Sequence, residues 1–456
     1  MSDSPIHRIP SISQLMELRP LKDLAHKVSS STVAEGVKAY LQPYQKKAME
    51  AAPALPYASL QSLASEISDW ILGQSGLSRP EVINATGQVL GADFPTGPIA
   101  EEILVQAHAR RHDYRQATAQ EHYRQAIEQL LCEMTGAQAA LIVSDRQAAV
   151  YLMTQALRGQ KTLVPRSQMS ATFDRIGLPK LLEDAGVQEV GSSNMIDLAA
   201  LAGEVEESAQ HLLWLDNTNF AASGTDVFPA TLEAIEQLKP CGVSLWAVLG
   251  VAGLLPDEVH QQLGLCSAKQ AIEAGADAVL VGGGFLLGGP GCAIVLGKKE
   301  CVSQLSELPI ASYLQAPPAS LAELEMALRI HQSGERVDDR IPVMSLLSTS
   351  EENLDLRATR LVEQLSVSAW IAEAEASPAE AFVLPGCIKL PTRRVTIKPT
   401  AEGAEPLLAQ LQSFPQVACW SQSGEEVVLD LRTFFPRNDA QIVSKLVPES
   451  NTIEGE

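Results

Sequence analysis

Two histidines have the spacing of a metal site. His108 and His112 lie four residues apart, which on a helix places both imidazoles on one face. Arg110 and Arg111 lie between them, and no glutamate or cysteine accompanies the pair. Because the two arginines disfavour a bound cation, a solvated helix face is the favoured interpretation.

A glycine-rich segment resembles a phosphate-binding loop at first sight. Six glycines lie between Gly282 and Gly291. The segment lacks the Gly-Lys-Ser/Thr ending of a Walker A loop and the Gly-x-Gly-x-x-Gly pattern of a dinucleotide turn. We therefore expect a tight turn, followed by Cys292 as a buried residue at the start of a strand.

The cysteines indicate a reducing compartment. The chain has seven, spread widely and without a Cys-x-x-Cys pair: Cys132, Cys241, Cys266, Cys292, Cys301, Cys387 and Cys419. An odd, scattered set predicts reduced thiols and not a zinc site or a disulfide framework. The N-terminus has no secretory pattern, and no apolar run reaches the ~18–20 residues of a membrane helix. We expect a cytoplasmic protein with no membrane partner.

Charge restricts where a nucleic acid could bind. The net charge is −21, and so acidic a surface repels phosphates overall. Residues 1–80 hold eight basic and seven acidic side chains, whereas the rest of the chain holds 26 basic and 48 acidic. Any contact with RNA is therefore expected through the N-terminal segment.

The first 78 residues predict a helical domain and linker. Ser11 precedes apolar residues at helical spacing, and Thr32 with Glu35 fits a capping box that starts a second helix. A proline-rich stretch at 51–56 separates these helices from another amphipathic run at 60–72.

Residues 79–330 predict a large α/β domain. Short apolar runs alternate with helical patterns, which is typical of a mostly parallel sheet covered on both faces. The expected strands are 140–144, 162–165, 188–190, 212–216, 243–249, 278–281 and 293–296.

Residues 331–456 predict a small α+β domain. A helical pattern at 351–365 precedes strand-like runs at 370–374, 395–398 and 427–431, with a further helix at 406–412.

Three stretches together resemble the bacterial L-seryl-tRNA(Sec) selenium transferase (selenocysteine synthase) family. They read RPEVINATGQVL at 79–90, QLLCEMTGA at 129–137 and LLGGP at 286–290. Further similarity at 190–194 and 428–432 extends the resemblance over residues 8–446. It implies the fold-type-I architecture of enzymes that use pyridoxal 5′-phosphate (PLP): a large domain with a mostly parallel seven-stranded sheet, an N-terminal helical segment and a C-terminal α+β domain.

The resemblance places the family's Schiff-base lysine at Phe285. In the family a Ser-Gly-Asp-Lys turn precedes Leu-Leu-Gly-Gly-Pro, whereas this chain has Gly282-Gly283-Gly284-Phe285. Phenylalanine cannot form a Schiff base. The aspartate that would hold the pyridinium nitrogen aligns with Val248, and we expect the two apolar side chains to close the pocket on itself. Lys298 and Lys299 match a lysine pair that the family already has, so we expect them at the surface.

The implied phosphate cradle has also changed. The family's Asn-rich turn aligns with Ser144-Asp145-Arg146-Gln147. An aspartate at a helix start usually caps that helix, and its carboxylate would repel a phosphate. Arg146 could offset this repulsion.

The substrate-side residues of the family are missing too. Thr96 and Met195 stand where arginines are expected, and a basic run of the family appears here as residues 120–125.

These losses favour a selenocysteine synthase-like protein without PLP catalysis, acting as a scaffold, regulator or partner subunit. No cofactor is then expected. The resemblance also implies a homo-oligomer, and it leaves open a lysine-bearing paralogue as partner and tRNA binding through residues 1–78. The alternative is an active PLP-dependent L-seryl-tRNA(Sec) selenium transferase. A third possibility is a repurposed PLP-independent enzyme, for which the sequence offers no named nucleophile.

Overall fold

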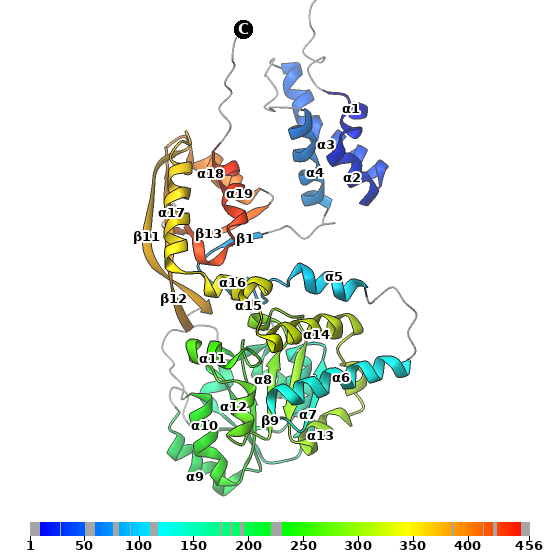
Figure 1. The fold of residues 1–456 in the computed structure, drawn as a ribbon, viewed down its shortest axis with the longest axis vertical. Coiled ribbons are helices and arrows are strands. Elements are labelled where there is room, and N and C mark those ends of the chain that lie inside the picture. Colours follow the sequence, from blue (N-terminus) through cyan, green and yellow to red (C-terminus); the bar gives the residue numbers. More distant parts are fainter. Residues whose placement is uncertain are drawn as a thin grey trace, which may run out of the picture.

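A computed structural model of the chain describes residues 10–27, 29–50, 60–75, 82–91, 93–109, 117–173, 176–182, 185–191, 196–219, 230–384, 387–413, 415–422 and 426–447. A seven-stranded and a five-stranded sheet with their helices, a small two-stranded sheet and a group of N-terminal helices make up this part (Figure 1). In it, no helix combines the length and apolarity that crossing a bilayer requires.

The larger sheet has seven strands, and this confirms the predicted fold class. Their order is β2 (Ala139–Val143), β10 (Ala293–Gly297), β9 (Ala278–Gly282), β8 (Ser244–Val248), β7 (His211–Leu215), β3 (Thr162–Pro165) and β6 (Gln188–Val190). Strand β10 runs antiparallel to both neighbours, and the other pairs are parallel. The near-continuous apolar runs form strands because both faces of this sheet are buried.

Helices cover both faces and produce two hydrophobic clusters. In β9, Val279 and Val281 join one cluster while Leu280 joins the other, as strand alternation requires. The first face is packed by α6 (Ala117–Thr135), α10 (Thr231–Leu238), α12 (Ala268–Glu273) and α14 (Pro318–Ser333). The second is packed by α7 (Arg146–Ala156), α8 (Leu178–Leu182) and α13 (Lys299–Ser306).

The smaller sheet has five strands and includes one from far upstream. Its order is β1 (Val82–Ala85), β13 (Gln416–Gln422), β14 (Glu426–Asp430), β12 (Cys387–Pro399) and β11 (Ile371–Leu384), packed by α17 (Glu351–Leu365), α18 (Ala404–Gln412) and α19 (Arg437–Leu446). The predicted boundary at residue 79 assigned β1 to the large domain, but β1 pairs in parallel with β13. A four-residue strand carries too little periodicity to reveal its partner. The other predicted boundaries stay predictions.

The turn that follows β1 packs against strands β12 and β14 of the small sheet through a buried polar network, here called the junction. It consists of Gly87, Thr392, Asp430 and Arg432. Asp430 accepts hydrogen bonds from Thr392 Oγ1 at 2.7 Å and from the Arg432 amide at 3.2 Å. Gly87, at φ +77°, approaches so closely that an added Cβ would lie 2.8 Å from Asp430 Oδ2.

Arg432 ties the junction to the rest of the chain. Its guanidinium donates to the carbonyls of Pro391, Leu346 and Leu347 at 2.6, 3.0 and 3.1 Å. The last two belong to α16 (Pro342–Ser348), so the junction connects the small sheet to the helices beside the large domain.

The N-terminal helices have a hydrophobic core of their own. They are α1 (Ile12–Met16), α2 (Arg19–Lys27), α3 (Ser30–Glu50) and α4 (Leu60–Ser75). Ser11 caps α1 through a capping box, as its position predicts. The capping box predicted at Thr32 is wrong: α3 begins at Ser30, and Ser29 Oγ accepts a hydrogen bond from the Thr32 amide at 3.1 Å.

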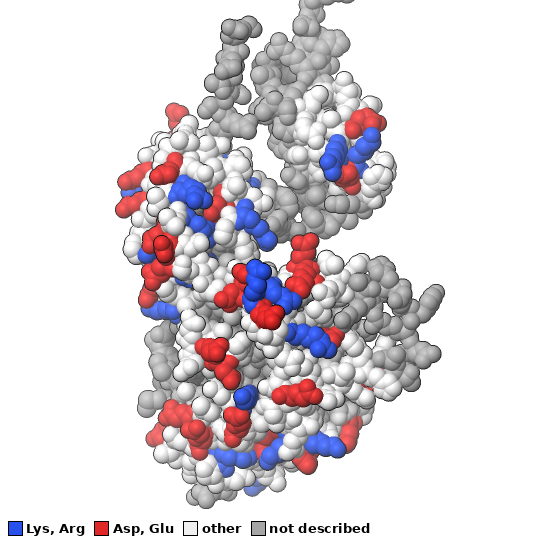
Figure 2. Space-filling view, viewed as in Figure 1, with Lys and Arg blue, Asp and Glu red and all other residues white. Residues whose placement is uncertain are grey.

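Acidic and basic side chains are interspersed on the face shown in Figure 2. Arg340 of α15 (Val337–Arg340) donates to Glu102 of α5 (Glu101–Ala109) at 2.7 Å, and Arg336 pairs with Asp339 at 2.8 Å. Such exposed pairs contribute little to stability but leave a mixed surface charge.

Candidate functional site

The carboxyl ends of six strands lie at one edge of the large sheet. Strands β2, β9, β8, β7, β3 and β6 run in the same direction, and β10 begins at this edge with Ala293 opposite both Val143 and Gly282. In open α/β sheets, ligands bind beyond the carboxyl ends of the strands. The residues at 144–147, 216–219 and 282–287 therefore define the candidate site.

Asp145 caps the helix that opens at this edge. Its backbone is extended, at φ −163° and ψ 174°, and Oδ1 accepts a hydrogen bond from the Ala148 amide at 2.8 Å. Ser144 Oγ donates to the other carboxylate oxygen at 2.9 Å. Capping by Asp145, predicted from the sequence, is confirmed. A carboxylate thus lies where the amides of α7 would face an anion.

Arg146 is a buried cation, with 8% of its surface exposed. Its Nη2 donates a hydrogen bond to Asn219 Oδ1. Its Cζ lies 5.1 Å from the centroid of the Phe285 ring, within the range of a cation–π interaction. Gln147, the next residue of α7, is half-buried.

Asn219 connects Arg146 to the ends of two strands. Its Nδ2 donates to the Asp216 carbonyl at 2.9 Å and to the Val248 carbonyl at 2.8 Å. Asn219 was not predicted as a site residue from the sequence. The feature of the sequence that could have indicated Asn219 is the run of polar residues after the apolar strand β7.

Asp216 is a second residue of this edge that was not predicted from the sequence. It is 8% exposed, and its carboxylate accepts from Thr218 Oγ1 at 2.6 Å and Thr231 Oγ1 at 2.8 Å. The Thr218 amide also donates to it, at 2.9 Å. Three donors satisfy this buried carboxylate, which gives it a structural role.

Phe285 has an unusual backbone. It begins the short 3-10 helix Phe285–Leu287 at φ +54°, a left-handed conformation that costs a non-glycine residue roughly 1–2 kcal/mol. Its half-buried ring lies against Gly282, where an added Cβ would be 2.6 Å from two ring carbons. Gly282 therefore provides the space that the ring occupies.

Val248 is 1% exposed at the end of β8 and belongs to the cluster under α7. Phe285 packs against the other cluster, and its ring also contacts Arg146 of α7 and lies against Gly282. Closure of one pocket by the two apolar side chains stays a prediction.

The glycine-rich segment is a tight turn, as predicted. The Gly283 amide donates to the Cys292 carbonyl at 2.8 Å, and an added Cβ on Gly283 would lie 2.4 Å from Cys292 Sγ. Burial raises the pKa of the Cys292 thiol to about 12, so it stays protonated and unreactive at neutral pH. The six cysteines whose side chains the structure describes are free thiols.

Other predicted positions lie away from this edge or have structural partners. Thr96 is exposed. Arg124, from the run that replaces the family's basic segment, is buried and donates to the carbonyls of Ile142 and Ala316. Lys298 pairs with Asp277 at 2.6 Å with half its side chain exposed. Met195 lies outside the described residues.

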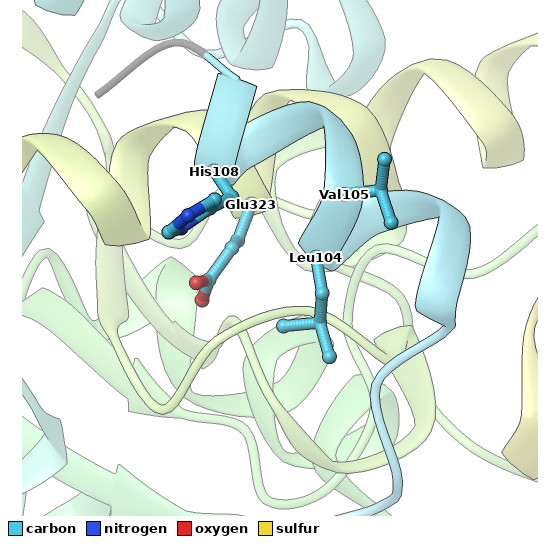
Figure 3. Close-up of a pocket in the computed structure, with 4 residues that line it drawn as sticks. All are labelled: Leu104, Val105, His108 and Glu323. Carbon is cyan, nitrogen blue, oxygen red and sulfur yellow. The ribbon is translucent and has the colours of Figure 1, made fainter. Parts of the chain in front are cut away.

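His108 lines a separate surface pocket of about 410 Å³ with Leu104, Val105 and Glu323 (Figure 3). Helix α5 supplies the first three and α14 the glutamate. His112 lies outside the described residues, so the predicted histidine pair is not tested. Within the described ranges, no group of three or more His, Cys, Asp and Glu side chains is arranged to hold a metal ion.

Comparisons with known proteins agree with this architecture. A solved structure titled D-glucosaminate-6-phosphate ammonia-lyase superposes with a TM-score of 0.57 at 17% identity, covering 82% of this chain and 96% of that one. Together with the strand order, this likeness assigns the fold to the fold-type-I class of PLP-dependent enzymes.

Sequence comparison identifies the family. The L-seryl-tRNA(Sec) selenium transferase of Hyphomonas neptunium is 27% identical, covering 94% of this chain and 96% of its own length. The protein of that name from Moorella thermoacetica is 28% identical, covering 97% and 96%. A family model for L-seryl-tRNA selenium transferase matches residues 82–435. The chain therefore belongs to the L-seryl-tRNA selenium transferase family.

Proposed function

We propose that this chain is a selenocysteine synthase-like protein without PLP catalysis, which acts as a scaffold, regulator or partner subunit. The observation that carries the proposal is the Phe285 ring, which lies against Gly282 and under the Arg146 guanidinium where the family motif expects a lysine. A lysine there is what the family's chemistry requires, because only an amine forms the Schiff base.

The neighbouring positions support the same conclusion. Val248 offers a buried aliphatic side chain where a carboxylate would keep the ring nitrogen protonated. Asp145 places a carboxylate at the start of α7, and charge repulsion there disfavours a phosphate dianion. Arg146 could attract the phosphate, but it is hydrogen-bonded to Asn219 and stacked on Phe285. These residues do not suit PLP, so no catalytic step is assigned to it.

The names of the relatives support a second candidate function. Proteins that align over almost the whole chain are called L-seryl-tRNA(Sec) selenium transferases. An active enzyme would need an amine from elsewhere to reach the site, since Lys298 is paired with Asp277.

Titration with PLP followed by borohydride reduction distinguishes the two functions. We expect no absorption band of a lysine Schiff base and no PLP-labelled peptide after reduction. A labelled lysine within the large domain would reject the proposal and favour the active enzyme.

The variant Phe285→Lys is the matched control for that titration. It returns an amine to the motif position, so any label it acquires at residue 285 shows that the assay detects a Schiff base at this site. If the variant is labelled and the natural chain is not, the missing amine explains the difference. If neither the natural chain nor Phe285→Lys is labelled, the double variant Phe285→Lys/Val248→Asp serves as the control. It also returns a carboxylate at the position expected to pair with the pyridinium nitrogen.

Several further expectations belong to this proposal. We expect a homo-oligomer in the cytoplasm, and possible partners are a lysine-bearing paralogue and a tRNA bound through residues 1–78. Gel-shift assays with tRNA at increasing salt test the last of these. Binding through the N-terminal helices should weaken with salt and be lost when residues 1–75 are removed.

A further inference from the structure

A second pocket lies at the carboxyl edge of the large sheet, away from the candidate site. It has a volume of about 520 Å³ and lies beyond the ends of β3 and β6, against α9 (Leu198–Ser208). None of its described lining residues belongs to the segments 144–147, 216–219 or 282–287. The volume is within the range of about 300–1,000 Å³ that small-molecule sites occupy.

The order of the strands favours a ligand at this place. Strand β3 lies between β6 and β7, which are the next two strands of this sheet along the chain. The crossover from β3 to β6 contains α8 and the crossover from β6 to β7 contains α9, and the two helices pack in different clusters on opposite faces of the sheet. In open parallel sheets, ligands bind at the carboxyl ends of the strands where the order reverses in this way.

One face of α9 presents both acidic and aliphatic side chains to the pocket. The residues of this face that line it are Asp197, Ala200, Leu201 and Glu204. Spacings of three, four and seven residues place all of them on the same side of a helix. Because each residue rises by about 1.5 Å, the two acidic residues are ~10 Å apart along the axis. An aliphatic segment therefore separates two anionic groups on one wall of the pocket.

Both carboxylates have capacity for a ligand. Asp197 caps α9 by accepting hydrogen bonds from the Ala199 and Ala200 amides at 3.0 and 3.2 Å. Both of these bonds use Oδ1, so Oδ2 can accept from another donor. Glu204 is exposed. A carboxylate offers about four lone-pair sites, so an interaction within the chain leaves it able to accept from an ammonium group as well.

Ser167 supplies a third polar group. It lines the pocket just after β3 and is 6% exposed, and its Oγ has no hydrogen-bond partner among the described residues. Buried hydroxyl groups are normally hydrogen-bonded, so this oxygen is a candidate contact for a ligand.

The charges of the rim select a cation. Arg166 pairs with Glu189 at 3.1 Å, so the charges of these two side chains largely cancel. Asp197 and Glu204 then leave the rim negative, and a negative rim repels phosphates and carboxylates. The apolar lining, such as Leu201, is aliphatic, and the described lining includes no aromatic ring that could stack on a base or enclose a quaternary ammonium.

We infer that this pocket binds an aliphatic diamine, with one ammonium group at Asp197, the other at Glu204 and the hydrocarbon chain against Ala200 and Leu201. Each ammonium group donates three hydrogen bonds and accepts none, which suits carboxylate oxygens. Ser167 offers a further acceptor in the wall of the pocket. The inference does not depend on the state of the PLP site, because the two sites share no described residue.

Isothermal titration calorimetry of the full chain with putrescine tests the inference. We expect saturable binding of one molecule per chain, which weakens as the salt concentration rises. n-Butylamine has the same carbon chain but one ammonium group, and it should bind about 5-fold more weakly or less. n-Butanol and butyrate should not bind, because one lacks the charge and the other reverses it.

Three variants and a matched control locate the binding. Asp197→Asn removes a charge but keeps a side chain that caps α9, and it should weaken putrescine binding by about 5-fold, as should Glu204→Gln. Ser167→Ala should weaken binding by about 3-fold without lowering stability, because its hydroxyl group has no partner to lose. The control Glu363→Gln removes an exposed acid of α17 and should bind putrescine as the natural chain does.

Three results would overturn the inference. Equal binding of putrescine by Asp197→Asn, Glu204→Gln and Glu363→Gln would show unspecific attraction to a chain with a net charge of −21. Binding of butyrate, or no binding of putrescine to the natural chain, would also reject a diamine site. If Asp197→Asn does not fold, Glu204→Gln gives the same test, since it changes an exposed position within the helix.

Discussion

Two regions of the molecule are built from segments that resemble the family: the carboxyl edge of the large sheet and the junction at the small sheet. They differ in how completely their buried groups are packed and hydrogen-bonded. At the junction, the 79–90 motif meets the 428–432 motif through Gly87, Asp430 and Arg432, and each buried polar group has a partner. At the edge, Phe285 is strained and half-buried, and it lies where the family resemblance predicts a lysine. This difference supports the proposed function, in which the scaffold is kept and the PLP chemistry is not.

Among the substitutions considered, Arg432→Met should lower the free energy of unfolding most. Its effect measures how much the junction contributes to stability. It leaves the carbonyls of Pro391, Leu346 and Leu347 without their buried donor, at an expected cost of about 3 kcal/mol in the free energy of unfolding. Urea denaturation gives the value. The control Arg329→Met removes an arginine whose side chain is 57% exposed and should cost less than about 1 kcal/mol. Equal losses in both variants would contradict this view of the junction.

Gly87→Ala should cost less than the arginine change, about 2 kcal/mol. The alanine must adopt φ +77° and also push its Cβ against Asp430 Oδ2. Gly136→Ala separates the two contributions, because Gly136 has φ +74° with nothing within 4 Å of an added Cβ, and it should cost about 1 kcal/mol. If thermal or urea unfolding gave the two alanine variants equal stability, the close approach at the junction would contribute nothing.

Phe285→Gly should change the free energy of unfolding least, by about 1 kcal/mol or less relative to the natural chain. Glycine relieves the left-handed strain of roughly 1–2 kcal/mol, while the half-buried ring forfeits a similar amount of packing and its contact with Arg146. Urea unfolding again provides the measurement. If the free energy of unfolding fell by more than about 2 kcal/mol, the edge would contribute as much to stability as the junction does. That result would contradict the contrast between the two regions.

Local patterns made much of the fold predictable. All seven strands of the large sheet were expected within one or two residues of their observed bounds, because fully buried strands form near-continuous apolar runs. Ser11, Asp145 and the glycine turn were also assigned correctly, since capping and close backbone packing depend on neighbours in the chain. Strands β1 and β13 were missed, because one has four residues and the other mixes polar and apolar side chains.

The sequence by itself therefore determined the family and the class of fold, and it predicted Phe285 at the position of the family's lysine. Only the tertiary structure decided what surrounds that position: Arg146 over the Phe285 ring, Asn219 hydrogen-bonded to Arg146, and Gly282 against the ring. It likewise decided that β1 joins a strand more than 300 residues away. Periodicity and capping are recorded in adjacent residues, whereas contacts between distant segments depend on how whole elements pack.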